Sequence, residues 1–309
     1  MVGYKLLSGF ARGCGRTAAR LVLYPITLYF LLRRGPERRA SREYLRQIAG
    51  RNASLWQVAQ HIHCFAAVTL DRVFLLSESF KRFDVRTFGL DQLRQAWAQE
   101  RGVLLLGSHL GSFDALRVLA DFRSDIKLRV VIDVGQNRNL SDVLNALNPQ
   151  LAQSVINARQ EGTTTALIIK EALDEKSLVT LLADRARPGN QVMTADFLGR
   201  PAPFPTAPWQ LAAALKVPVV LCFGLYRGGN RYDLHFETFA EQLKLDRAQR
   251  DAELQQTIQR FADRVAHHAR SAPYNWFNFY DFWRADDSQT AATGDVDAAA
   301  GDSGRGARR

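Results

Sequence analysis

Cysteine is scarce in this chain of 309 residues, which contains only three. Cys14, Cys64 and Cys222 show no paired spacing and no C-x-x-C motif. Their distribution excludes a disulfide framework and gives no cysteine-based metal centre. The simplest expectation is a protein of a reducing, cytoplasmic environment that needs no metal and no cofactor.

A hydrophobic run long enough to cross a bilayer is also missing. The longest candidate, Ala18 to Leu32 (AARLVLYPITLYFLL), is 15 residues and has no charge after Arg20. A membrane-spanning helix needs roughly 20 apolar residues, and Pro25 is expected to kink this one. Arg33 and Arg34 follow where a signal peptide has a small-residue cleavage site, which disfavours a signal peptide.

Acidic residues are few in the first 50 positions. Ten lysines and arginines stand there against two glutamates, a local net charge of +8 out of +10 for the whole chain. Basic residues flank the apolar run on both sides, and Tyr24 and Tyr29 suit a membrane interface. We therefore expect residues 1–80 to form membrane-associating helices that lie in or on the bilayer. The alternative is a buried core helix with a solvated basic end.

The rest of the chain alternates between short apolar runs and helical patterns, which indicates an α/β fold with a central, largely parallel mixed sheet flanked by helices. We expect an α/β domain over residues 81–285 and a disordered tail over 286–309. The expected strands are Val103–Gly107, Leu128–Val134, Ser154–Asn157, Ser177–Ala183, Val217–Tyr226 and Tyr232–Glu237. The expected helices are Leu90–Glu100, Asn139–Leu151, Thr163–Asp174, Thr206–Lys216 and 246–271, with one or two more between Ser41 and Ser79.

The stretch from Arg101 to Leu119 is the centre of this pattern. It contains the buried strand and then, from Ser112, apolar residues at helical spacing. His109 and Asp114 lie five positions apart, about 140° apart on a regular helix, so they meet only if His109 is in the strand-to-helix turn. In that arrangement His109 is a general base and Asp114 holds its imidazole in one tautomer. The structural alternative, a turn histidine that caps the helix, is the more common one from spacing alone.

The segment His109 to Asp114 (HLGSFD) resembles the HX4D/E block of the lysophospholipid acyltransferase superfamily. Three further segments are similar to the branch that contains the lipid A biosynthesis lauroyl and myristoyl acyltransferases: Ala183 to Arg185 (ADR), Phe197 to Pro205 (FLGRPAPFP) and Pro273 to Trp276 (PYNW). The resemblance covers roughly residues 15–285. Stand-alone members of this branch act outside lipid A synthesis, so an acceptor other than lipid A stays open.

The resemblance implies a glycerolipid acyltransferase-like fold and a membrane-associated O-acyltransferase. It would move a fatty acyl group from an acyl carrier protein or coenzyme A thioester to a lipid hydroxyl, with His109 and Asp114 as the catalytic dyad. The implied location is the cytoplasmic face of a bacterial inner membrane, with no nucleic acid as partner.

A second set of candidates is expected to bind substrate. Asp184 ends a buried strand, as His109 nearly does, and parallel sheets bind ligands at the carboxyl ends of their strands. The full set is Asp184, Arg185, Arg187, Arg138, Gly199 and Arg200, whose arginines can clamp a phosphate. Phe197, Leu198 and Phe204 are expected to line an acyl groove or to be core residues, and His61 and His63 to be ordinary helix residues.

Two other functions stay open at this stage. One is an esterase or thioesterase with Ser108 or Ser112 as nucleophile beside His109, although neither serine lies in a G-x-S-x-G elbow. The other is a non-catalytic protein that binds membrane or nucleic acid, suggested by a pI near 9.8. No signature of a nucleic-acid-binding module is present, and the charge lies beside an apolar helix.

Overall fold

The computed structural model describes residues 2–76, 82–99, 101–117, 127–132, 154–158, 162–186 and 189–283, with the backbone alone for residues 2–14 and 117. The expected helix at Asn139–Leu151 and the expected disordered tail at 286–309 lie outside these residues. Arg138 and Arg187 lie outside them as well.

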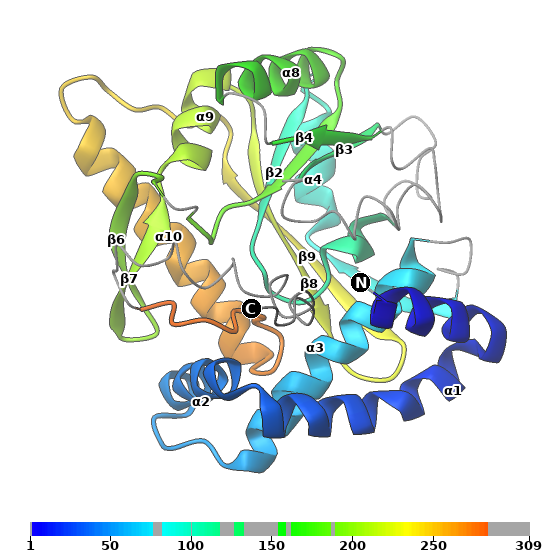
Figure 1. The fold of residues 1–309 in the computed structure, drawn as a ribbon. Helices are drawn as coiled ribbons and strands as arrows, with labels where there is room; N and C mark the ends of the chain where they lie inside the picture. Colours follow the sequence, from blue (N-terminus) through cyan, green and yellow to red (C-terminus); the bar gives the residue numbers. More distant parts are fainter. Residues whose placement is uncertain are drawn as a thin grey trace, which may run out of the picture.

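A seven-stranded sheet forms the centre of the molecule, in the order β1-β9-β8-β2-β5-β3-β4 (Figure 1). Its strands are β1 (Asp84–Phe88), β2 (Val103–Gly107), β3 (Leu128–Ile132), β4 (Val155–Asn157), β5 (Leu178–Leu182), β8 (Val219–Tyr226) and β9 (Arg231–Ala240). Neighbouring strands are parallel except for the antiparallel pair β8 and β9. The prediction of an α/β fold with a largely parallel mixed sheet is confirmed.

Both faces of this sheet are buried, and the alternation of side chains along β2 divides them. Leu104 and Leu106 belong to one hydrophobic core, with residues of α8 (Gly162–Asp174), α9 (Ala207–Leu215) and α10 (Arg250–Ser271). Val103 and Leu105 belong to a second core, with residues of α3 (Leu55–Leu75) and α4 (Leu90–Trp97). Burial on both sides explains why β2 is a continuous apolar run.

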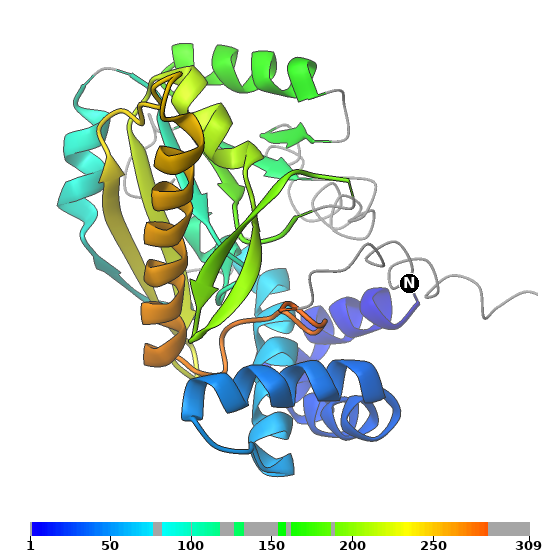
Figure 2. The ribbon, with the colours of Figure 1, turned by 90° about the vertical axis from the view of Figure 1, so that its left-hand side faces the viewer.

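Two features of the sheet region differ from the sequence expectations. Strand β1 was not predicted, because its alternating exposed and half-buried residues (DVRTF) carry a weak apolar signal at the sheet edge. The segment up to Pro205, for which no strand was predicted, is an antiparallel hairpin of β6 (Val192–Phe197) and β7 (Arg200–Pro205). Leu198 and Gly199 make its turn with φ of 57° and 85°, and the hairpin lies beside α10 (Figure 2).

The N-terminal part is helical: α1 (Val2–Arg33), α2 (Gly35–Ala49) and α3. Helical dihedrals break in α1 at Gly15 (φ 83°, ψ 166°), whereas Pro25 lies within the helical part. The helix is therefore interrupted ten residues before the expected kink. In the part of the chain that the structure describes, no helix has both the length and the apolar character that crossing a membrane requires.

Helix α3 is fixed at its start and in its middle. Ser54 and Gln57 form a capping box at its N-terminus. His61 is fully buried and joins Ser41 Oγ (2.8 Å) to the carbonyl oxygen of Trp276 (2.9 Å). His61 and His63 are thus helix residues, as expected, and His61 ties α2 and α3 to the C-terminal segment.

The turn after β2 passes very close to β8. Gly111 has φ of 73°, forms a bridge with Gly224, and a Cβ added to it would overlap the Gly224 carbonyl oxygen. Only glycine suits this position, because the left-handed region disfavours a side chain and the close backbone excludes one.

We expect Gly111→Ala to lower the free energy of unfolding by about 3 kcal/mol or more, since strain and overlap add. Gly199→Ala is the matched control, because Gly199 also has a positive φ but has open space around it. Strain alone predicts a loss of about 1–2 kcal/mol there. Urea unfolding of both variants measures the difference, and equal losses would contradict the close approach.

Candidate active site

Two loops that leave neighbouring strands form the candidate site. Strands β2 and β5 pair in parallel, with Gly107 opposite Leu182 at their carboxyl ends. Two residues beyond the end of each strand lie His109 and Asp184, whose side chains are directly hydrogen bonded. The edge of the sheet at which ligands were expected therefore brings these two side chains together.

The contact between His109 and Asp184 is doubled. Nδ1 of His109 lies 2.8 Å from Oδ1 of Asp184, and the backbone N–H of His109 donates to Oδ2 at 3.0 Å. The Asp184 side chain is completely buried, whereas 29% of the His109 side chain is exposed. Nε2 of His109 makes no hydrogen bond to any described residue. The ring is therefore fixed on one side and open on the other.

The expectation that Asp114 holds His109 is wrong in this structure. Asp114 lies in the first turn of a short 3-10 helix, η2 (Phe113–Arg117), and pairs with Arg72 of α3 at 2.7 Å. Ser112, the residue before η2, donates its N–H to the Gly224 carbonyl at 2.6 Å, and η2 therefore starts beside β8. Asp114 then reaches α3, and the carboxylate on His109 comes from a residue 75 positions later.

The loop that carries His109 is held by backbone contacts to the C-terminal segment, residues 273–283. The His109 carbonyl accepts from Phe277 N–H at 2.8 Å, and Gly111 N–H donates to the Asn275 carbonyl at 2.7 Å. These bonds enclose Leu110, which forms an isolated bridge with Trp276. The aromatic C-terminal segment thus packs on the core and positions the loop.

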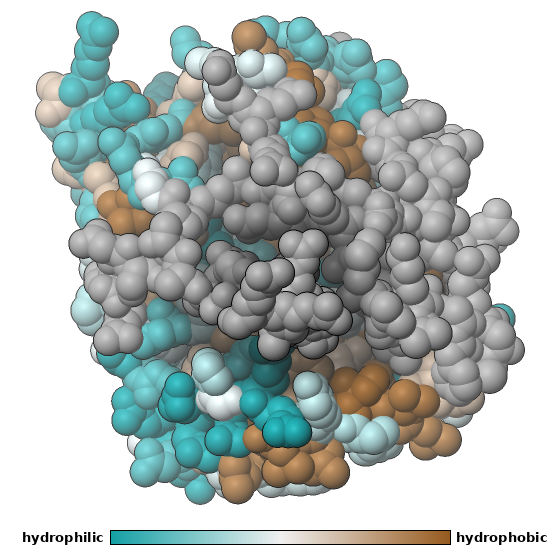
Figure 3. All heavy atoms as spheres, in the orientation of Figure 1, coloured by the Kyte–Doolittle hydropathy of each residue, from teal (hydrophilic) through white to brown (hydrophobic). Residues whose placement is uncertain are grey.

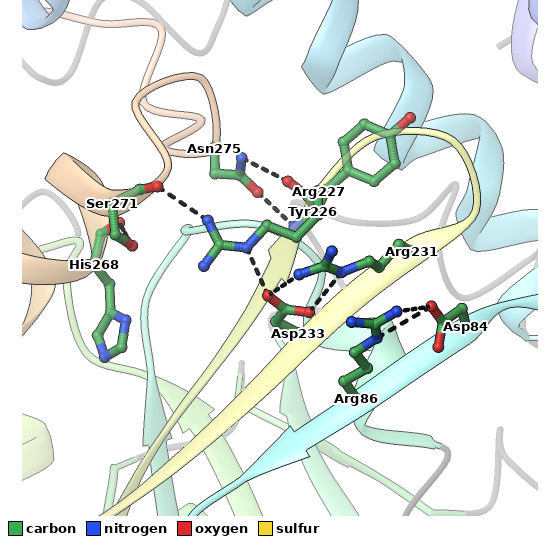
Figure 4. A network of polar contacts seen from close by, with 9 residues as sticks. All are labelled: Asp84, Arg86, Tyr226, Arg227, Arg231, Asp233, His268, Ser271 and Asn275. Atoms are coloured by element: carbon green, nitrogen blue, oxygen red, sulfur yellow. Dashed lines mark hydrogen bonds and ion pairs between the residues drawn. The ribbon is translucent and has the colours of Figure 1, made fainter.

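The same segment is fixed to the β8–β9 hairpin by a polar network (Figure 4). The Asn275 amide accepts from Tyr226 N–H at 2.7 Å and donates to the Tyr226 carbonyl at 3.1 Å. Arg227 joins Asp233 (2.8 Å) to the Ser271 carbonyl (3.0 Å) at the end of α10. Burial alone would raise the pKa of Asp233, but hydrogen bonds from Arg231 and Arg227 hold it below its ordinary value.

Arg185 extends the site beyond Asp184. Its Nη2 donates to the Phe277 carbonyl at 2.7 Å, its Nε donates to Asn278 Oδ1, and its guanidinium lies 5.5 Å from the Tyr280 ring centroid. Asn278 also donates to Oδ2 of Asp184 at 3.4 Å. The remaining nitrogen, Nη1, makes no hydrogen bond within the described part of the chain.

Burial, more than the nearby charges, favours a neutral imidazole at His109. Burial lowers the pKa of His109 below its ordinary value, Asp184 opposes this, and the positive charges of Arg185 and Arg72 add to the lowering. Burial raises the pKa of Asp184, but the charge and hydrogen bonds of His109, together with Arg185, outweigh burial, so the pKa lies below its ordinary value. Asp184 is therefore ionised and His109 uncharged near neutral pH.

The remaining predicted site residues that the structure describes, Gly199 and Arg200, do not join His109. Arg200 pairs with Glu43 of α2 and lies 5.7 Å from the ring centroid of Trp283, and Gly199 is in the β6–β7 turn. Phe197, Leu198 and Phe204 are buried in the main core, which decides for the core alternative. In the described part of the chain, no cluster of three or more histidine, cysteine or acidic side chains is arranged to hold a metal.

Sequence reasoning missed Arg72, Asn275 and Asn278 as neighbours of the site. Arg72 lies in a helical pattern and carried no signal. The two asparagines lie in the segment PYNWFNF, whose first four residues resemble the family. That resemblance did not predict a contact between either asparagine and the site.

Residues 54–285, about three-quarters of the chain, match the family model described as bacterial lipid A biosynthesis acyltransferase. No curated protein matches the chain. The matched region begins at the cap of α3 and contains the whole sheet, both strand ends that carry His109 and Asp184, and the segment that positions them. The chain therefore belongs to the bacterial lipid A biosynthesis acyltransferase family.

Proposed function

We propose that this protein is a membrane-associated O-acyltransferase with His109 as general base. It moves a fatty acyl group from an acyl carrier protein or coenzyme A thioester to a lipid hydroxyl, at the cytoplasmic face of a bacterial inner membrane. The observation that carries the proposal is the imidazole held on one side by a buried carboxylate and open on the other. The family supports acyl transfer to a lipid.

The carboxylate defines which nitrogen of His109 acts. Since an ionised Asp184 only accepts hydrogen bonds, the proton of the neutral ring is on Nδ1, and Nε2 has a free lone pair. Asp184 also stabilises the imidazolium that forms when Nε2 takes a proton. Asp184, in place of Asp114, thus has the positioning role in the dyad.

The reaction needs only one proton acceptor. Nε2 removes the proton of the acceptor hydroxyl while its oxygen attacks the thioester carbonyl carbon. The tetrahedral intermediate collapses with cleavage of the carbon–sulfur bond, and the imidazolium returns the proton to the leaving thiolate. A thioester is already activated, so a base and charge stabilisation suffice, without metal, cofactor or acyl-enzyme.

Arg185 is placed to meet negative charge during this reaction. Its Nη1 is open while its other nitrogens are fixed, so the guanidinium is preorganised. Both donors carry the phosphate of their phosphopantetheine arm, which Arg185 can bind as well. Arg72 lies near enough to His109 to lower its pKa and adds to the positive field.

The alternative, hydrolysis by a serine nucleophile, has less support. Ser108 and Ser112 are both buried, 5% and 1% exposed, and neither Oγ has a hydrogen-bond partner among the described residues. A serine nucleophile needs its base within hydrogen-bonding reach. Neither serine is paired with His109.

Membrane association is proposed from an exposed apolar stripe on α1. Leu21, Tyr24, Leu28 and Leu32 repeat at helical spacing and are 55–66% exposed. Trp56, at the start of α3, is 72% exposed. Figure 3 shows hydrophobic residues gathered on the lower part of the molecule, where Figure 1 draws α1. An exposed apolar surface beside basic residues is typical of helices that lie in the membrane interface.

We expect His109→Gln to reduce acyl transfer by ~10²- to 10⁴-fold, because it removes the proton acceptor. It also removes the Nδ1–H donor to Asp184, so the rate is compared on protein shown by circular dichroism to be folded. Ser108→Ala and Ser112→Ala are the controls and should retain transfer. The wild-type rate should fall at acidic pH with a midpoint below 6.5, since the pKa of His109 is lowered and protonation abolishes the base. A serine variant that loses all activity would favour the hydrolase instead.

Asp184→Asn and Asp114→Asn separate the two candidate partners of His109. We expect Asp184→Asn to lower the pKa of His109 further, because it removes an adjacent negative charge. It should also reduce the turnover of acyl transfer with little effect on donor affinity. Asp114→Asn should change both much less. NMR titration of the imidazole, assigned with His109→Gln, measures the pKa; a larger effect of Asp114→Asn would restore the original dyad.

Leu28→Asp should weaken binding to phospholipid vesicles roughly tenfold or more, since burial of a leucine side chain stabilises by about 1.5–3 kcal/mol. The matched control is Leu167→Asp on α8, because Leu167 is similarly exposed at 61% and lies outside the stripe. Cosedimentation with vesicles compares them. Equal binding by the two variants would remove the stripe as the membrane contact.

A further inference from the structure

An open pocket lies where α1 is interrupted, and none of its residues takes part in the site around His109. Its volume is about 450 Å³, and it is lined by Gly15, Arg16, Thr17, Arg82, Gly229 and Asn230. Figure 1 shows α1 changing direction beside the turn between β8 and β9, which supplies the last two of these residues.

Two glycines keep the pocket hollow. Gly15 and Gly229 both have positive φ, 83° and 58°, and a Cβ built on either would meet no atom within 4 Å. A side chain there would project into open space. In the same turn as Gly229, the Asn230 amide donates to the Arg82 carbonyl at 2.9 Å, which fixes the turn.

Positive charge exceeds negative charge around this pocket. Asp71 is fully buried and accepts from Arg16 at 2.7 and 2.8 Å, with Arg20 at 3.8 Å and the Tyr232 hydroxyl at 2.9 Å. A single carboxylate thus serves two guanidinium groups. The exposed guanidinium of Arg82 has no hydrogen bond or ion pair with any residue that the structure describes. Among the described residues, Arg16 and Arg82 line the pocket and Arg20 lies beside it, donating to the Gly229 carbonyl at 2.7 Å. Against the single charge of Asp71 these three leave two positive charges, and with the open volume this suits an anion such as a phosphate group.

The pocket opens at one end of the apolar stripe. Thr17 lines the pocket, and Leu21 and Tyr24 follow it by four and seven positions, so all three lie on the same face of the helix. At a rise of about 1.5 Å per residue, Leu21 is only about 6 Å along the axis from Thr17. Leu21 and Tyr24 are 66% and 64% exposed. A charged group in the pocket thus lies beside a surface suited to acyl chains.

We propose that this pocket binds the phosphate of an anionic membrane phospholipid, whose acyl chains lie along Leu21 and Tyr24. The inference rests on the membrane association proposed above and adds a defined headgroup site to it. Charge selects the headgroup, while the stripe supplies the apolar contact.

Arg82→Gln tests the pocket, because the Arg82 guanidinium has no partner among the described residues and no part in the site of His109. The control is Arg94→Gln on α4, which removes the same charge from another exposed site. We expect Arg82→Gln to bind phosphatidylglycerol-containing vesicles roughly fivefold more weakly than the wild type, and phosphatidylcholine vesicles equally well. Inorganic phosphate should compete with the anionic vesicles for wild type more than chloride does at equal ionic strength.

Three outcomes would overturn the inference. Equal losses in Arg82→Gln and Arg94→Gln would show nonspecific charge attraction. If wild type and Arg82→Gln bind vesicles equally but phosphate raises the melting temperature of wild type alone, the pocket is a site for free phosphate. If wild type binds neither kind of vesicle, membrane association itself is refuted. If wild type binds vesicles and Arg82→Gln does not change that binding, only the pocket is refuted.

Discussion

The fully buried carboxylate of Asp184 is the constraint on which the candidate site depends. Transfer of an ionised carboxylate out of water costs several kcal/mol unless hydrogen bonds and opposite charge replace the water. His109 supplies two hydrogen bonds, Asn278 a longer one, and Arg185 a positive charge. These partners come from three separate segments of the chain. The need to satisfy one charge therefore fixes the β2 turn, the end of β5 and the C-terminal segment relative to one another.

The same physical solution occurs at two further buried acids. Asp71 joins α3 to α1 through Arg16 and to β9 through the Tyr232 hydroxyl. Asp233, on β9, accepts from Arg227 and Arg231, and Arg227 reaches on to the end of α10. In each case an acid that is costly to bury alone is held by cations: Asp71 by Arg16 of α1, and Asp233 by Arg231 of the same strand and by Arg227 of the β8–β9 turn. Helices at the N-terminus and at the C-terminal end are in this way attached to the sheet that carries the site.

Local patterns in the sequence were enough to predict the buried strands, because β2, β5 and β8 are apolar on both faces. They failed where the signal is weak or nonlocal. Strand β1 alternates between exposed and half-buried residues, and the β6–β7 hairpin contains three prolines, which are uncommon in strands. The partner of His109 was misassigned because Asp114 is near in sequence, whereas parallel register across the sheet brings Asp184 next to it. Sequence spacing does not report that register.

The surroundings of His109 combine a neutral base with positive charge, and in the proposed reaction both are needed at once. A positively charged neighbour lowers the pKa of a histidine and so weakens it as a base, while an adjacent carboxylate does the reverse. Asp184 compensates in part for Arg185 and Arg72, and burial keeps the ring uncharged. In the proposed reaction the positive charge of the arginines would stabilise the charge that develops on the carbonyl oxygen and the departing sulfur, where a negative neighbour would oppose the reaction. The carboxylate lies buried on the Nδ1 side of the imidazole, so under this proposal it supports the base without putting negative charge on the Nε2 side, where the thioester would react.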